Sequence, residues 1–168
     1  MFKKNFLNFL YIIFLGAISS YSLPPYNYFI INFITFSLFF IFLINKKKEV
    51  VKNSFFFKYG WCFGFGYFIF SLYWVSISLT FDQSLKFLIP LALIILPAFL
   101  AIFYGLITYL FSFFYSKNVV VSFFTFSIFF GLIEFIRGSI FTGFPWNLIA
   151  FSFSENTYFI QILSVIGT

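Results

Sequence analysis

The sequence predicts an all-α, polytopic transmembrane helix bundle. Of its 168 residues, 62% are hydrophobic and 8% are charged, whereas soluble domains carry roughly 25% charged residues. The charges are clustered and leave apolar runs of about 20 residues, the length that crosses a hydrocarbon core as a helix. These runs lack the polar–apolar alternation of a transmembrane β-barrel. We expect one transmembrane region over residues 1–168, with about five full spans and a truncated apolar segment, residues 158–168.

The first expected span, residues 6–22, follows two lysines and ends before Pro24-Pro25, because proline cannot continue a helix. The charged start, the apolar run and the small residues at Ala17-Ile-Ser19 also fit a secretory signal peptide. Several further spans follow, so an uncleaved first helix is favoured over a cleaved signal.

The second expected span, residues 26–44, ends at a lysine-rich segment, residues 45–52. We interpret this segment as a solvated loop that anchors the topology. The alternative, a binding site for anionic lipid, would need more positive charge. The third span, residues 59–79, carries Gly60 and Gly64 on one face, a spacing typical of close helix packing.

The fourth and fifth expected spans, residues 87–113 and 119–137, precede an outer-face loop, residues 138–157. Pro90 falls in the first turn of the fourth span, where proline is tolerated. Pro97 lies deeper and is expected to kink the helix.

The basic residues predict the orientation of the bundle. A cytoplasmic N-terminus places eight of the ten Lys and Arg residues inside, which the positive-inside rule favours. The loop after the fifth span then lies on the outer face. The inside residues are Lys3, Lys4, Lys46, Lys47, Lys48, Lys52, Lys58 and Lys117, and the outside residues are Lys86 and Arg137.

The residue types exclude several kinds of site. Histidine is absent and Cys62 is the single cysteine. The chain therefore has no Ser–His or Cys–His couple, no His-based metal site and no intrachain disulfide. Its four acidic residues are scattered. We expect no metal, no cofactor and no nucleic-acid partner, and we assign no catalytic residue to this chain.

One segment, Glu134 to Asn147, combines both signs of charge with glycine, proline and tryptophan. Counted from Val119, Glu134 lies about 22 Å along the fifth helix, near the outer end of the hydrocarbon. Arg137 is three residues further, so the two share a helix face and can pair. Ionisable groups at this depth are functional candidates; the alternative is a structural ion pair. Gly143-Phe-Pro-Trp146 then forms a turn that sets an indole at headgroup level.

Two motifs in this segment resemble the signature of bacterial apolipoprotein N-acyltransferases. They are Leu132-Ile-Glu-Phe-Ile-Arg-Gly138 and Thr142-Gly-Phe-Pro-Trp-Asn147. Residues 16–26, with the Pro-Pro turn, are similar to the family's first helical hairpin. Residues 60–74, where glycines precede a Tyr-Trp pair, are similar to its third helix. The resemblance implies that five residues line the site at the outer interface where lipid is admitted and its acyl chain held: Glu134, Arg137, Phe144, Pro145 and Trp146.

The resemblance also implies a reaction in the bacterial inner membrane. Such enzymes move an acyl chain from a phospholipid, through a cysteine thioester, to the α-amino group of a lipoprotein's N-terminal diacylglyceryl cysteine. The catalytic Glu, Lys and Cys belong to an outer nitrilase-like domain, which this chain lacks. We therefore expect an N-terminal fragment that is inactive alone.

The partners that the resemblance implies are the phospholipid donor and the diacylated lipoprotein. The fragment is either one half of a split enzyme, whose further partner is a separately encoded nitrilase-like domain, or the product of a decayed or frameshifted gene. Two other functions stay open. In a transporter or channel subunit, Glu134 and Arg137 would line a pathway, although the internal repeat common in transporters is absent. The chain could also be a small membrane scaffold without a ligand.

Overall fold

The computed structural model describes residues 2–49, 51–140, 147–155, 158 and 161. Every regular element within these residues is helical, which confirms the predicted all-α class for them. In chain order the elements are α1 (Phe2–Ser19), η1 (Ser20–Ser22), α2 (Ile30–Lys48), α3 (Asn53–Ser71), α4 (Tyr73–Ser78), η2 (Gln83–Leu88), α5 (Ile89–Phe113), α6 (Val119–Ile140) and η3 (Ile149–Phe153).

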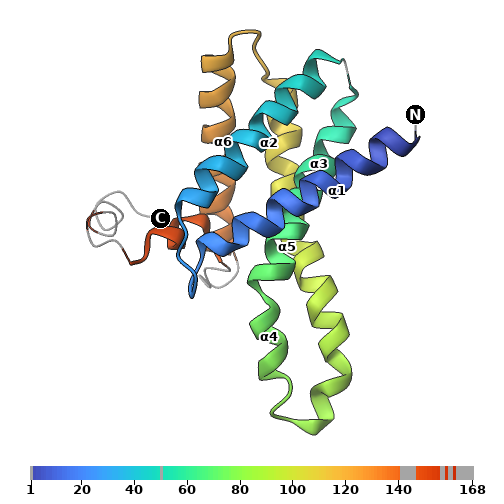
Figure 1. Cartoon of the computed structure of the whole chain (residues 1–168), viewed down its shortest axis with the longest axis vertical. Coiled ribbons are helices and arrows are strands. Elements are labelled where there is room, and N and C mark those ends of the chain that lie inside the picture. The colour runs from blue at the N-terminus through green and yellow to red at the C-terminus, as the bar shows by residue number, and fades with distance from the viewer. Residues whose placement is uncertain (1, 50, 141–146, 156–157, 159–160, 162–168) are drawn as a thin grey trace.

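The central helix is α3, which packs against α1 and α5 (Figure 1). Glycines permit both contacts. A Cβ atom on Gly60 would lie 2.2 Å from Oγ1 of Thr108 on α5, and one on Gly66 would lie 2.1 Å from the carbonyl oxygen of Ile13 on α1. Gly64 also faces α5. The predicted role of the Gly60 and Gly64 face in close helix packing is therefore confirmed.

The core that joins α2 and α6 to this centre is largely aromatic. Phe39 on α2 stacks on Phe63 of α3, with ring centroids 4.4 Å apart. Tyr104 of α5 contacts Phe63 on one side and Phe130 of α6 on the other. Offset and edge-to-face ring pairs each add about 0.5–1.5 kcal/mol beyond area burial. Packing of aromatic rings thus holds α2 and α6 in the bundle, whereas close contacts at glycines hold α1, α3 and α5 together.

The expected third span, 59–79, corresponds to two helices rather than one. α3 starts earlier, at Asn53, and a break at Leu72 separates it from α4. At the break the carbonyl of Ser71 accepts a hydrogen bond from Nδ2 of Asn147 at 2.7 Å, while the N–H of Val75 donates to Leu72 at 3.0 Å. The Asn147 side chain thus replaces one backbone hydrogen bond of the helix at the break.

Two predicted loops begin later than expected. α2 includes Lys46, Lys47 and Lys48 as its last turn, where cations interact favourably with the carbonyl end of the helix. α6 continues through Gly138 to Ile140, although the outer loop was expected from residue 138. Glycine inside a helix costs only about 1 kcal/mol relative to alanine, so helix packing outweighs it here.

Among the described residues, three segments are long and apolar enough to cross a membrane: α2, Lys86–Phe113 and α6. The apolar helix Phe6–Ser22 is shorter. The structure therefore supports a multi-pass membrane protein, while the count of five spans stays a prediction. Of residues 158–168, only 158 and 161 are described, so the predicted truncated segment stays a prediction.

Figure 1 shows where the connections lie. The α2–α3 and α5–α6 connections share one end of the molecule, the upper one in this view. The α1–α2 turn and the C-terminal end of α6 lie toward the other end, and α4 projects beyond them together with the first half of α5.

Candidate functional site

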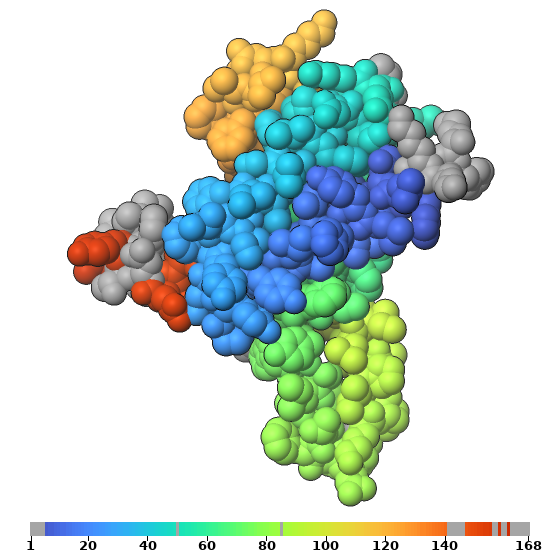
Figure 2. Space-filling model, in the orientation of Figure 1, coloured from blue at the N-terminus to red at the C-terminus, as the bar shows by residue number. Residues whose placement is uncertain are grey.

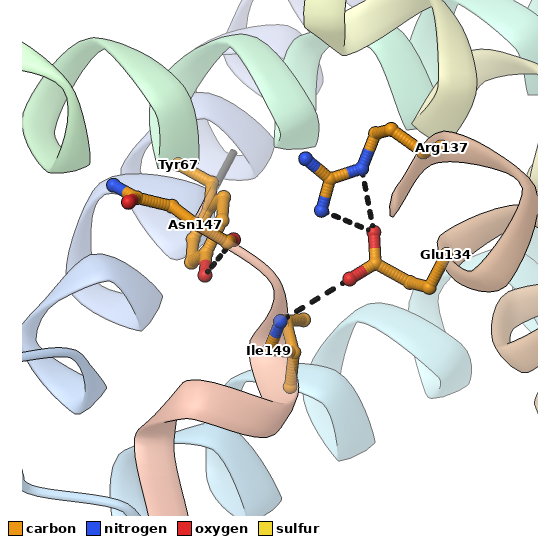
Figure 3. Close-up of polar contacts among 5 residues, drawn as sticks. All are labelled: Tyr67, Glu134, Arg137, Asn147 and Ile149. Carbon is orange, nitrogen blue, oxygen red and sulfur yellow. Dashed lines mark hydrogen bonds and ion pairs between the residues drawn. The ribbon is translucent and has the colours of Figure 1, made fainter. Parts of the chain in front are cut away.

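Glu134 and Arg137 form an ion pair near the C-terminal end of α6 (Figure 3). Nη2 of Arg137 lies 2.7 Å from Oε1 of Glu134, and Nε lies 3.0 Å from the same oxygen. The Arg137 side chain is 0% exposed and the Glu134 side chain 12% exposed. Each charge offsets the burial cost of the other. The pairing predicted from their spacing is confirmed.

The second carboxylate oxygen of Glu134 holds the returning chain. Oε2 accepts a hydrogen bond from the backbone N–H of Ile149 at 3.2 Å (Figure 3). Ile149 is the first residue of η3, and N–H groups at a helix start have no partner within the helix. One carboxylate therefore neutralises a buried cation and anchors the segment that follows α6.

Asn147 ties the same segment to α3. The Tyr67 hydroxyl donates to the Asn147 carbonyl at 3.0 Å, and Nδ2 of Asn147 donates to the carbonyl of Ser71 at 2.7 Å. The φ angle of Asn147 is +44°, a left-handed conformation that asparagine adopts more readily than most residues. The side chain and the backbone carbonyl of Asn147 thus both hydrogen-bond to α3.

Aromatic rings enclose the guanidinium on the α3 and α5 side. The Arg137 Cζ atom lies 5.0 Å from the centroid of the Phe68 ring. Tyr67 and Tyr104 each pack against Phe68, and all three rings are buried. The Tyr104 hydroxyl has no hydrogen-bond partner among the described residues. The pair therefore lies in a water-poor environment, where polar interactions are stronger than at a wet surface.

The other three predicted site residues, Phe144, Pro145 and Trp146, lie outside the described residues. Their place in the site stays a prediction. The described chain ends at Ile140 before them and resumes at Asn147 after them. The part before them is α6, which carries the Glu134–Arg137 pair, and the part after them contacts Glu134 through Ile149 of η3.

The contacts of Glu134 hold neighbouring groups in place. Both oxygens of the Glu134 carboxylate are engaged. Within the described part of the chain, no group of three His, Cys, Asp or Glu side chains could hold a metal ion. Cys62 is a free thiol buried in α3.

Sequence reasoning missed four residues that build the site: Tyr67, Phe68, Asn147 and Ile149. The Tyr67–Asn147 contact joins positions 80 residues apart, which no local pattern reveals. Asn147 did carry a signal, as a polar residue directly after the Gly-Phe-Pro-Trp motif.

Comparison with known proteins identifies the family. Residues 15–168 match the model of the apolipoprotein N-acyltransferase N-terminal domain. The chain belongs to the apolipoprotein N-acyltransferase family. The resemblance seen in the motifs is thereby confirmed, and the matched range includes every residue of the site described above.

Named apolipoprotein N-acyltransferases are similar over the same region. The protein from Rhizobium rhizogenes is 36% identical over 160 residues, covering 90% of this chain and 30% of the relative. The Brucella melitensis protein is 33% identical over 162 residues, again 90% and 30%. The Rickettsia bellii protein is 39% identical over 126 residues, which is 74% of this chain and 24% of the relative. The chain thus spans about 30% of the length of these apolipoprotein N-acyltransferases.

Proposed function

We propose that this chain forms the membrane-embedded N-terminal part of an apolipoprotein N-acyltransferase. The reaction is the transfer of an acyl chain from a phospholipid to the N-terminal diacylglyceryl-cysteine amine of a lipoprotein. The match of residues 15–168 to the N-terminal domain of this family carries the proposal. The apolar helices α2, α5 and α6 support a membrane location, which we assign to the bacterial inner membrane.

In this proposal the end of α6 is the membrane-side wall of the lipid site. Glu134 and Arg137 hold the segment that leaves α6 and returns as η3. Phe144, Pro145 and Trp146 belong to that segment and would line the site toward the lipid. The support is the double anchoring of the segment, to α6 through Ile149 and to α3 through Asn147.

The catalytic residues lie elsewhere in this proposal. No catalytic residue is assigned to the chain, and the family's thioester chemistry requires a nucleophilic cysteine at the outer face. A nitrilase-like domain encoded with or apart from this chain would supply it. We therefore expect no acyl transfer by the purified chain 1–168 with phospholipid and a diacylated lipoprotein peptide, and measurable transfer would contradict this division of labour.

The orientation follows from charge. The end of α2 and the α2–α3 and α5–α6 connections lie at one end of the molecule (Figure 1). Five lysines belong to these segments: Lys46, Lys47 and Lys48 in the last turn of α2, and Lys52 and Lys117 in the connections. The positive-inside rule assigns such an end to the cytoplasm. The N-terminus is then cytoplasmic, and the Glu134–Arg137 pair lies toward the outer face.

A chimera tests the proposal. This chain replaces the matching region of the Rhizobium rhizogenes relative, and acyl transfer to a diacylated lipoprotein peptide is measured in membranes. Retained transfer supports the proposal; a chimera that inserts stably without any transfer contradicts it.

In the active chimera, Trp146→Ala should lower activity while leaving membrane insertion unchanged. Trp61→Ala is the matched control, because its indole N–H donates to the carbonyl of Ala98 between α3 and α5 rather than belonging to the proposed wall. Unchanged activity of the Trp146→Ala chimera would reduce this tryptophan to an interfacial anchor.

A further inference from the structure

Residues 73–96 project from the bundle as an arm, which consists of α4, η2 and the first part of α5. The residues on either side of the arm, Leu72 and Pro97, are both buried. Between them, no side chain that the structure describes is buried. Figure 2 shows the arm as a narrow projection at the lower end of the molecule. The arm therefore has no buried core of its own to fix its direction.

Both ends of the arm carry a weak point in the helix backbone. Leu72 has φ −111° and ψ 7°, and each angle is about 50° from its α-helical value. Pro97 lies inside α5 and has no N–H to donate to the carbonyl of Leu93. Gly64 of α3 faces Ala101 of α5, and the two helices run antiparallel (Figure 1), so Leu72 comes near the level of Leu93. The arm can therefore tilt about this level as one unit.

The Asn147 side chain occupies the carbonyl group that a straight helix would use at this level. Its Nδ2 donates to the carbonyl of Ser71 at 2.7 Å. In a continuous helix this carbonyl would accept from the N–H of Val75, which instead donates to the carbonyl of Leu72 at 3.0 Å. Helices bend where a side chain inserts into their hydrogen bonds. Exchange of the two donors would join α3 and α4 and still leave the Ser71 carbonyl paired.

From these features we infer that Asn147 is a releasable clamp on the arm. While its Nδ2 is bound to Ser71, the arm is bent away from the axis of α3. When Asn147 leaves, the N–H of Val75 takes its place, and α3 and α4 become one helix. Because Asn147 belongs to the segment that returns after α6, a displacement of that segment changes the tilt of the arm. The inference concerns the conformation of this chain and does not depend on acyl transfer.

The arm forms one wall of a cavity at the same junction. The cavity has a volume of about 330 Å³, and its lining combines Trp74 of the arm with Pro24 of the α1–α2 turn, Asn147 and Phe151 of η3. Trp74 follows the bend at Leu72, so straightening moves this wall relative to the others. The clamp therefore sets the width of the cavity as well as the direction of the arm.

Distances between spin labels measure the tilt of the arm in the full chain, reconstituted in lipid nanodiscs. The labels are attached to cysteines introduced at Ile77 of the arm and Phe124 of α6, which are both exposed, in a Cys62→Ala background. Asn147→Gly removes the Nδ2 donor and still permits the positive φ. We expect this variant to shift the main distance by on the order of 5 Å, because Ile77 lies about 7.5 Å along the helix from Leu72.

Three controls separate the clamp from a general loosening of the junction. Tyr67→Phe removes the other hydrogen bond between Asn147 and α3 and should leave the distance unchanged. Val75→Pro, added to Asn147→Gly, removes the donor that the straight helix needs, in the first turn of α4 where proline is tolerated. It should restore the bent distance. A label pair at Ile34 of α2 and Phe124, both exposed, lies outside the arm and should report one constant distance.

The results that would overturn the inference are distinct. Asn147→Gly with the wild-type distance would mean that the bond does not hold the bend. The same shift in Tyr67→Phe would mean that any loss at the junction moves the arm. A change between Ile34 and Phe124 in Asn147→Gly would show that Asn147 holds the bundle rather than the arm. A shifted distance that persists after Val75→Pro would show that the released arm does not continue α3.

Discussion

Oε2 of Glu134 and the backbone nitrogen of Ile149 are joined by a 3.2 Å hydrogen bond across fifteen residues of chain. The other oxygen of the same carboxylate binds Arg137, whose side chain is fully buried. Loss of the carboxylate would therefore remove two things at once: the counter-charge of a buried cation and the anchor of η3. The stability of the pair and the position of the returning segment are linked through one side chain.

Glu134→Gln should lower the free energy of unfolding by about 3–5 kcal/mol, because it leaves the Arg137 charge buried without a counter-charge. Unfolding of the detergent-solubilised chain by a harsher detergent, followed by circular dichroism, measures the change. The double variant Glu134→Gln/Arg137→Met should recover most of the loss, since no uncompensated charge remains.

The matched control for this prediction is another i,i+3 pair, Lys46–Glu49, with a 2.8 Å contact and a Glu49 side chain that is 50% exposed. The Lys46 side chain is 9% exposed, but water reaches the pair through the half-exposed Glu49 carboxylate. Glu49→Gln should therefore cost no more than about 1 kcal/mol. If Glu134→Gln lowered the free energy of unfolding by no more than Glu49→Gln does, burial would not make the Glu134–Arg137 pair more costly to break.

Asn147 supplies a second anchor, and two of its properties can be separated. Asn147→Gly keeps access to the positive φ but loses the Nδ2 bond to Ser71, so it should cost about 0.5–1.5 kcal/mol. Asn147→Val loses the bond and also resists the left-handed conformation, which adds about 1–2 kcal/mol. The free energies of unfolding of the two variants give the comparison. Equal values would mean that the backbone at position 147 carries no strain in the valine variant.

The sequence alone was sufficient for local features and insufficient for distant ones. The Glu134–Arg137 pair and the packing face of Gly60 and Gly64 follow from helical periodicity, and both are seen in the structure. The break at Leu72 was missed because the Ser71 carbonyl beside it accepts its hydrogen bond from Asn147, a residue far along the chain. No proline or glycine at position 72 announces it.

The lysine-rich segment shows a different limit. Its charge predicts that these residues contact water, which is compatible with a loop and equally with the last turn of a helix. The favourable interaction of Lys46–Lys48 with the carbonyl end of α2 selects the helix. Composition thus predicts the environment of a segment better than it predicts where a helix ends.

Glycine contacts should decide the stability of the α3 interfaces. Gly60→Ala should destabilise the chain by about 1–3 kcal/mol, because its Cβ would lie 2.2 Å from the Tyr104 carbonyl and the overpacked backbone must shift. Gly131→Ala is the matched control in α6: its Cβ meets open space, so it should stabilise by about 0.4–1 kcal/mol. Thermal unfolding in detergent ranks the two, and the opposite order would mean that α3 and α5 are not held at this distance in the membrane.

Membrane orientation can be read from labelling of introduced cysteines. Gln83 lies in the outer α4–α5 connection and Lys117 in the cytoplasmic α5–α6 connection of the proposed topology, and both are exposed. A membrane-impermeant maleimide applied to cells with a permeabilised outer membrane should label Gln83→Cys and spare Lys117→Cys. The wild-type chain is the background control, because its single cysteine, Cys62, is buried. Lysis should make Lys117→Cys reactive. Labelling of Lys117→Cys before lysis, with Gln83→Cys protected, would invert the bundle and place the Glu134–Arg137 pair toward the cytoplasm, where the proposed outer lipid site could not exist.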